Sequence, residues 1–352
     1  MKLVSLHLYL YLFLFLLLSS CRKDELCATC PPTGPDTTSH DFVWTIDTLG
    51  GAQSSALHDI AIVNDTLAYA VGEIYLTDSF GQVDPNAYNV AKWDGKKWNL
   101  LRVPTQAFGG SIGFYPVEAV FAFSPNNVWM FSVAGSYSHW NGSTWETEFV
   151  AERSGGGTKL WGTSSADLYL AGTNGSISYY NGSVWARIES GTTLDIKDIW
   201  GDGNEILAVA SKPFVTYEKM VLKISGSIAT ALSDSGIDEP VGCLWFSSTH
   251  HYYAAGSGIY EKSDLAESQW KNGPLDITRY YVYGMRANGP NDVVAVGGFG
   301  EVLHYNGASW SSYHDYVGLA AGNYYAVAIK KNLVIAVGAD PSYAYVLVGR
   351  RP

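Results

Sequence analysis

The stretch YYNGSVW, residues 179–185, contains the pattern that decides the fold: an aromatic residue, an Asn-Gly pair, two variable residues and a Trp. Asn-Gly accepts the positive backbone φ angles of tight hairpin turns, so the stretch predicts the tip of a β-hairpin. Near-copies are KWDGKKW (92–98), HWNGSTW (139–145) and HYNGASW (304–310). A turn that recurs in this way indicates a repeat architecture.

The spacing of the copies gives the period of the repeat. The Asn or Asp of the four turns stands at positions 94, 141, 181 and 306, so the first two spacings are 47 and 40 residues. The last gap, 125 residues, is close to three repeats and predicts two degenerate copies within it. Candidates for these are KISGSIAT (223–230) and ESQWKNG (267–273).

A second motif precedes each hairpin. In LWGTSSADLYLAGTNG (160–175) an apolar strand is followed by a polar turn and an alternating apolar strand that ends in Gly. A period of about 42 residues with four strands is typical of a propeller blade. The same plan occurs at 60–73, 120–135, 199–211, 244–258, 283–300 and 327–340, which makes seven repeats with 160–175.

The two ends of the repeat region complement each other. The seventh repeat lacks an outer strand with a Trp, whereas VWTIDT (43–48) resembles the outer strand VWARIES (184–190) and precedes the first full repeat. We therefore expect an all-β, seven-bladed β-propeller of four-stranded blades over residues 41–352. The N-terminal strand would pair in the last blade and remove an open sheet edge. Trp145, Trp185 and Trp310 are expected to pack between blades rather than to form a sugar platform.

The first 21 residues indicate the compartment. Lys2, the apolar run 8–18 and LSSC (18–21) form a secretory signal. The LSSC ending resembles the lipobox of bacterial lipoproteins. That resemblance implies removal of the signal peptide, residues 1–20, and lipidation of Cys21 with palmitate-type chains. The alternative is an ordinary signal with an incidental Cys.

Residues 21–40 read as a lipidated, flexible tether rich in Pro, Thr and Ser. Lys23, Asp24 and Glu25 resemble the signal that exports lipoproteins of Bacteroidota to the cell surface. This implies an outer-membrane, lipid-anchored protein facing outward, with a periplasmic orientation as the alternative. Cys27 and Cys30 form a CxxC without the strand–helix context of a redox motif, so we expect a local disulfide.

Composition narrows the class of partner. The chain carries 33 acidic against 22 basic residues, a net charge of −11, and no basic stripe, which argues against a nucleic-acid partner. Aromatic residues make up 14% and Gly numbers 37, a profile typical of a β-rich extracellular protein with many tight turns.

No catalytic motif stands out. The hairpin resembles the repeat of sialidase propellers but lacks its Ser-x-Asp part, and the arginines are scattered. The sequence contains no nucleophile elbow, zinc-protease motif or phosphate-binding loop in a fitting context. It favours a non-catalytic protein. The alternative is a glycan-active hydrolase or transferase whose carboxylates come from separate blades at the propeller mouth.

Long loops are the candidate ligand surface, because binding residues concentrate on loops that a rigid scaffold carries. The insertion 73–89 in the first repeat has side chains suited to sugars or peptide, and two further long loops carry aromatic residues. The alternatives are a solvated insertion, or a calcium site at the two aspartates; we expect no other cofactor or metal. The candidate residues are Tyr75, Asp78, Asp84, Asn86, Tyr88, Tyr115, Phe214 and Tyr217.

Taken together, the chain resembles propeller-repeat lipoproteins of Bacteroidota and related bacteria over nearly all of the mature sequence. The resemblance implies a monomeric binding or scaffold protein of the cell envelope. Its partner would be a glycan or another envelope protein.

Overall fold

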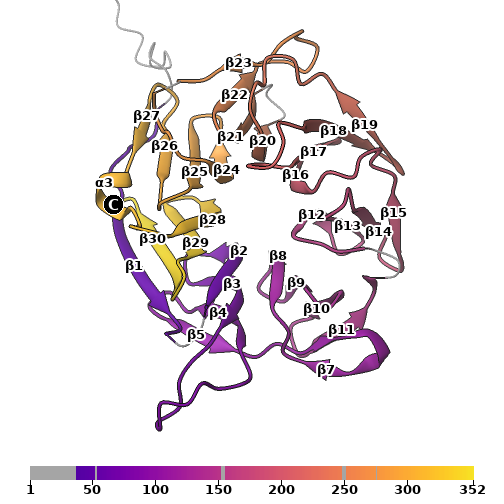
Figure 1. Cartoon of the computed structure of the whole chain (residues 1–352), viewed down its shortest axis with the longest axis vertical. Helices are drawn as coiled ribbons and strands as arrows, with labels where there is room; N and C mark the ends of the chain where they lie inside the picture. The colour runs from indigo at the N-terminus through magenta and orange to yellow at the C-terminus, as the bar shows by residue number, and fades with distance from the viewer. Residues whose placement is uncertain (1–36, 52–53, 152–154, 248–250, 275) are drawn as a thin grey trace, which may run out of the picture. The chain divides into compact units, whose positions relative to one another are not determined.

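The computed structural model describes residues 37–51, 54–151, 155–247, 251–274 and 276–352. Residues 37–352 form one compact unit. Within this unit, seven four-stranded antiparallel sheets are arranged as blades in a ring (Figure 1). The prediction of a seven-bladed propeller is confirmed. The signal peptide, residues 21–36 of the tether, Cys21, Lys23, Asp24, Glu25, Cys27 and Cys30 lie outside the described residues.

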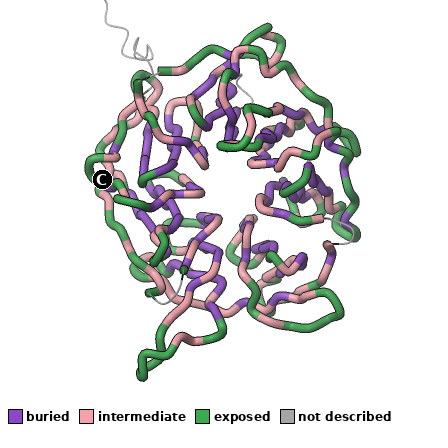
Figure 2. Tube along the Cα trace, viewed as in Figure 1, coloured by how far each residue is buried: buried purple, intermediate pink, exposed green. Residues whose placement is uncertain are grey.

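The first two strands of each blade carry most of the core. The innermost strands are β2 (Ala56–Asn64), β8 (Val117–Ser124), β12 (Lys159–Ser164), β16 (Ile196–Asp202), β20 (Val241–Ser247), β24 (Val282–Gly289) and β28 (Asn323–Lys330). The second strands are β3 (Leu67–Ile74), β9 (Asn127–Ser132), β13 (Asp167–Ala171), β17 (Glu205–Ser211), β21 (His251–Gly256), β25 (Asp292–Gly297) and β29 (Leu333–Ala339). The buried residues lie within the blades, and exposed residues follow the rim (Figure 2).

The third and outermost strands complete the sheets. The third strands are β4 (Tyr88–Trp93), β10 (Ser136–Trp140), β14 (Ile177–Tyr180), β18 (Lys219–Ser225), β22 (Ile259–Lys262), β26 (Val302–Tyr305) and β30 (Ala344–Arg350). The outermost strands are β5 (Trp98–Leu101), β11 (Trp145–Phe149), β15 (Trp185–Ile188), β19 (Ile228–Leu232), β23 (Lys271–Asn272), β27 (Trp310–Ser312) and β1 (Val43–Leu49). A small ribbon, β6 (Thr105–Gln106) with β7 (Ile112–Gly113), and a short helix, α3 (His314–Val317), lie in connections between blades.

The ring is closed by the N-terminal strand. β1 pairs antiparallel with β30, from Val43 opposite Arg350 to Leu49 opposite Ala344. The last blade therefore takes its outermost strand from the start of the domain and its other three strands from the end. This closure, expected from the match of 43–48 to 184–190, gives the C-terminal strand a partner on both sides.

Antiparallel strand order divides the connections between two faces of the ring. One face carries the turns between first and second strands and the Asn-Gly hairpins, and we call it the hairpin face. The opposite face carries the loops between second and third strands and the connections between blades, and we call it the loop face. Among the described residues, no helix is long and apolar enough to cross a membrane.

The repeated hairpin is built as its sequence predicts. Asn181 Oδ1 accepts hydrogen bonds from the backbone N–H groups of Ser183 and Val184, both at 3.0 Å, and Gly182 has φ +90°. Tyr180 pairs with Trp185 across the strands, with ring centroids 5.2 Å apart. Such cross-strand aromatic pairs stabilise a sheet.

The hairpin tryptophans also join neighbouring blades. Trp185 is 4% exposed and packs in a core cluster with Phe131 of the second blade and Leu168 of its own blade. Trp145 packs against a cluster shared by the first two blades, and Trp310 against one shared by the fifth and sixth. The expected blade-to-blade role of these residues is confirmed.

Candidate functional site

Exposed apolar side chains gather on one face of the ring. Among the described residues, the exposed large hydrophobic side chains outside the loop face are Val43, Ile46, Val184 and Ile228. The loop face carries the rest: Phe80, Phe108, Ile112, Phe114, Tyr115, Val133, Phe214, Val215, Tyr217, Phe299, Tyr316 and Tyr343. Aromatic residues in excess on one surface mark a site of interaction.

The insertion of the first blade, 75–87, folds largely on itself. Asp78 Oδ1 accepts the backbone N–H groups of Phe80 and Gln82, at 2.8 and 2.9 Å. Asp84 accepts the N–H of Asn86 and forms an ion pair with Arg102. Both carboxylates therefore hold the loop together.

The tyrosines of this insertion have internal partners as well. The Tyr75 hydroxyl donates to Glu73 at 3.1 Å, and the guanidinium of Arg102 lies 4.1 Å from the centre of the Tyr88 ring. Within the described residues, no group of three or more His, Cys, Asp or Glu side chains is arranged to hold a metal ion. The calcium site at Asp78 and Asp84 stays a prediction.

The other candidate residues lie on the same face. Tyr115 stands between the first two blades and Tyr217 in the β17–β18 loop, exposed by 37% and 73%. Phe214, in that same loop, is 76% exposed and has φ +64°, a backbone conformation that a bulky residue rarely adopts. Such strain is found preferentially where loops contact ligands.

The innermost strands contribute a second set of side chains through β-bulges. In every innermost strand except β12, one extra residue interrupts the pairing near the start of the strand, at the loop face. A bulge breaks the alternation of side chains and re-aims the extra residue. The residues at these bulges are His58, Glu118, Lys197, Gly242, Tyr283 and Tyr325.

Three of these bulge residues belong to a run of rings that we call the aromatic arc: Phe214, Tyr281, Tyr283, Tyr325 and His58. Centroid distances between successive rings are 5.1, 4.9, 5.7 and 6.5 Å. The arc extends from the fourth blade, across the sixth and seventh, to the first. Glu118 of the second blade follows His58 at this end of the arc, and its Oε1 lies 3.9 Å from Nε2 of His58.

A glycine makes the arc continuous across the fifth blade. A Cβ at Gly242 would lie 2.7 Å from Cε1 of Tyr281 and 2.9 Å from its hydroxyl oxygen. The bulge of the fifth blade therefore supplies space instead of a side chain. The Tyr281 ring fills this space and reaches Phe214.

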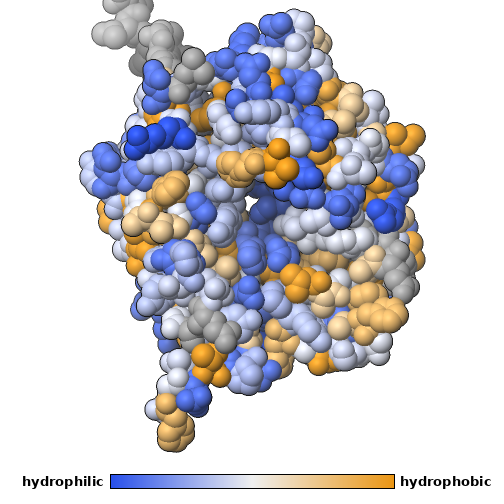
Figure 3. Space-filling view, in the orientation of Figure 1, coloured by the Kyte–Doolittle hydropathy of each residue, from blue (hydrophilic) through white to orange (hydrophobic). Residues whose placement is uncertain are grey.

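Below the arc, two ion pairs cross the channel between non-adjacent blades. Lys159 Nζ lies 2.8 Å from Asp59, and Arg286 binds both oxygens of Asp198 at 2.8 Å. The channel cavity has a volume of about 280 Å³. Figure 3 shows it opening at the centre of the ring, with hydrophilic side chains in its depth.

Each oxygen of the two channel carboxylates has a hydrogen-bond or ion-pair partner within the protein. Besides its ion pair, Asp59 accepts the N–H of Val120, and Asp198 accepts those of Ile199 and Leu244. Each aspartate thus connects its blade to the innermost strand of the next. This arrangement is that of a structural cross-brace between blades.

Cys243 lies at the same strand position in the fifth blade as Asp198 in the fourth. It is fully buried, and burial raises the pKa of its thiol well above the ordinary value. Because the thiolate is the reactive form, this cysteine is an inert core residue.

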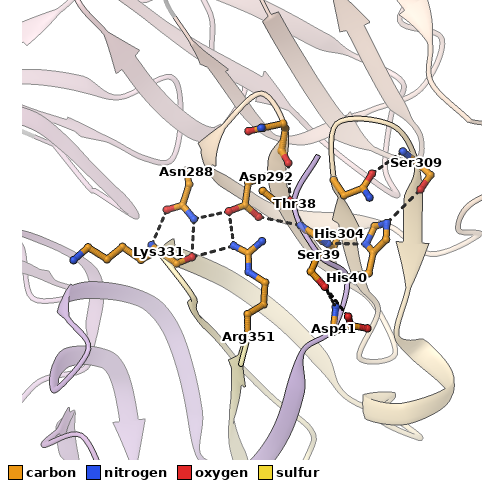
Figure 4. A network of polar contacts seen from close by, with 12 residues as sticks. Thr38, Ser39, His40, Asp41, Asn288, Asp292, His304, Ser309, Lys331 and Arg351 are labelled. Carbon is orange, nitrogen blue, oxygen red and sulfur yellow. Dashed lines mark hydrogen bonds and ion pairs between the residues drawn. The ribbon is translucent and has the colours of Figure 1, made fainter. Parts of the chain in front are cut away.

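A second polar network ties the N-terminal segment to the sixth blade at the hairpin face (Figure 4). His40 Nδ1 lies 2.8 Å from His304 Nδ1, and His304 Nε2 lies 3.0 Å from Asp292, which also pairs with Arg351. Burial, then the neighbouring His304, lowers the pKa of His40. Burial raises the pKa of Asp292, but the hydrogen bonds from His304 and Arg351 outweigh it and leave the pKa low.

This network belongs to the scaffold. The Asp292–His304 pair occupies the cross-strand position that Asn127–His139 occupies in the second blade and Glu205–Lys223 in the fourth. Its unusual member is His40, which extends the pair to the closing strand.

The loop aromatics could be found from the sequence, whereas the arc could not. Phe214 is the only predicted candidate residue that lies in the arc. Tyr283, Tyr325 and His58 have the sequence pattern of ordinary alternating strand residues, because a bulge leaves no fixed signature in composition or period. Tyr281 directly precedes a strand and carries no signal of its own. The Tyr-Tyr-Val-Tyr run at 280–283 is the one local signal that aromatic residues accumulate there.

Solved structures share the fold. A YCF48 structure described as bound to a D1 peptide is similar with a TM-score of 0.64 and 15% identity, over 92% of this chain and 99% of that one. YCF48 from Cyanidioschyzon merolae has a TM-score of 0.61 and 14% identity, over 87% of this chain and 98% of that one. The WD40 β-propeller domain of Doa1 has a TM-score of 0.59 and 14% identity, over 91% of this chain and 97% of that one. No family model and no curated protein sequence matches the chain.

Proposed function

We propose that this protein is a lipid-anchored, non-catalytic binding protein of the cell envelope, and that its loop face binds an extended segment of a partner protein. The observation that carries the proposal is the one-sided display of aromatic side chains on the loop face, together with the arc in which Tyr283 lines the channel cavity. A structurally similar propeller, YCF48, is described as bound to a peptide, which supports a protein partner. Fold similarity alone does not assign function, so the proposal depends on the site.

The anchor would leave this face accessible. Thr38 donates its N–H to the carbonyl of Asn306 and its hydroxyl to that of Asn291, both in turns of the hairpin face. A tether that joins the propeller at this point starts from the face opposite the aromatic arc. The described chain therefore begins on the hairpin face, so the proposed lipid anchor would not be attached through the loop face.

The anchor is tested by the substitution Cys21→Ser in the full chain. We expect the protein to move from the membrane fraction to the soluble fraction, because several acyl chains give a lasting anchor and their loss removes it. Cys243→Ser is the matched control, since that thiol is buried in the core. Membrane retention of Cys21→Ser would contradict the lipid assignment.

The binding face is tested with residues 37–352, which contain all seven blades and the closing strand. This unit is screened in parallel against immobilised random dodecapeptides and a glycan array. We expect peptide binding that falls with Phe214→Ser on the loop face and persists with Val184→Ser on the hairpin face; both side chains are exposed, by 76% and 48%. Binding confined to glycans would replace the protein partner by a sugar. Equal loss in both variants would show that binding does not use the loop face.

A further inference from the structure

We propose that the aromatic arc receives the cationic end of a lysine or arginine side chain of the partner, held against Tyr283 and Tyr325 and attracted by Glu118, which lies beyond His58 at the end of the arc. The inference rests on the proposed function, because it names the side chain by which a protein segment would be recognised on the loop face.

The two tyrosines provide ring surfaces at the channel mouth. Tyr283 lines the central cavity, and its ring meets that of Tyr325 edge-to-face at 79°, with centroids 5.7 Å apart. Both side chains are partly exposed. A cation within about 6 Å of a tyrosine ring is attracted by the negative face of its π-system.

Glu118 supplies a negative charge at the end of the arc. Its side chain is 24% exposed, and His58 Nε2 at 3.9 Å is too far for a hydrogen bond. The nearby channel charges are already paired: Asp59 with Lys159, and Asp198 with Arg286. Lys197, the bulge residue of the fourth blade, is paired with Asp195 at 3.1 Å. The side-chain charge that these pairs leave at the mouth is therefore the negative charge of Glu118.

The charged side chains of the wider loop face are also predominantly negative. Among its described loops the basic residues are Arg102, Lys212 and Arg279, whereas the single loop 233–240 contains Asp234, Asp238 and Glu239. The whole chain has a net charge of −11. An acidic face steers cationic partners toward it and disfavours anionic ones.

The experiment uses the peptides that bind residues 37–352 in the dodecapeptide screen. Each is resynthesised with its lysines or arginines replaced one at a time, lysine by acetyl-lysine and arginine by citrulline, and affinities are measured by fluorescence anisotropy. We expect one position at which loss of the charge weakens binding about tenfold, as for a partly desolvated cation on aromatic rings. The measure is the ratio of the affinity of the charged peptide to that of its uncharged counterpart. This affinity ratio should fall toward one in Glu118→Gln and in the double variant Tyr283→Leu, Tyr325→Leu.

The control separates this site from the general acidity of the face. Asp238→Asn removes an exposed charge from the 233–240 loop, which holds none of the residues proposed to bind the cation, and should leave the affinity ratio unchanged. If Asp238→Asn lowers it as much as Glu118→Gln, the preference is a property of the whole face and the inference is overturned. Peptides that bind without any cationic preference also overturn it, while the proposed function stands. If no peptide binds, the proposed protein partner and this inference fail together.

Discussion

The two faces of the ring use similar side chains for different purposes. On the hairpin face, Trp145, Trp185 and Trp310 follow the repeated turns and pack between blades. On the loop face, Phe214, Tyr217 and other aromatic residues are exposed. Aromatic content alone therefore does not distinguish core from site. The position in the repeat does, because a hairpin tryptophan is placed over the neighbouring blade and a loop aromatic is not.

The largest expected difference between the faces is in stability. Trp185→Ala should lower the free energy of unfolding by about 3–5 kcal/mol, because it empties a buried site between two blades. Phe214→Ala should change it by less than about 0.5 kcal/mol, because that ring is exposed. Chemical denaturation followed by tryptophan and tyrosine fluorescence measures both. Similar losses in the two variants would mean that the Phe214 loop is part of the core.

A substitution at the fifth blade sharpens the comparison within the loop face. Gly242→Ala should cost about 1–3 kcal/mol, because its Cβ would overlap the Tyr281 ring and the Val282 carbonyl, each at 2.7 Å. It should also change the near-ultraviolet circular dichroism of the tyrosines. Gly289→Ala is the control, since its Cβ would meet only an ordinary contact at 3.6 Å from Asn291. An unchanged spectrum for Gly242→Ala would show that the space at Gly242 does not position the Tyr281 ring in the arc.

The smallest effect concerns pH and the hairpin face. The pKa of His40 is lowered in the folded chain, so between that value and the ordinary 6.5 the unfolded chain binds more protons. The free energy of unfolding should therefore fall as the pH drops below about 6.5, and it should return to its full value above that pH. Melting temperatures between about pH 7.5 and 5.5 measure this slope, above the range in which carboxylates titrate.

The variants needed for this slope are both histidine substitutions. His40→Gln should flatten the slope, although not completely, because burial also lowers the pKa of His139. His251→Gln, at an exposed position, is the matched control for the substitution itself. A slope in His40→Gln as steep as in the parent would show that the His40–His304 contact does not titrate with folding.

The fold could be predicted almost completely from local signals. Asn181-Gly182 specifies its turn through the side-chain oxygen of Asn181 and the positive φ of Gly182, and neither depends on distant residues. The candidate site could be predicted in part. Phe214 was found because a long loop with aromatic residues stands out in a regular repeat, and the structure places it at one end of the arc.

What the sequence by itself determined is the repeat: its period, seven blades of four strands, the closing segment at 43–48 and the tryptophans between blades. These follow from turn chemistry and strand alternation, which act over a few residues. Only the tertiary structure decided the aromatic arc and the ion pairs of the channel. Closure of the ring brings His58 beside Tyr325 and Asp198 beside Arg286, and bulges turn the extra residues toward the mouth. Contacts between residues so far apart in sequence depend on the geometry of the whole ring, which no local pattern encodes.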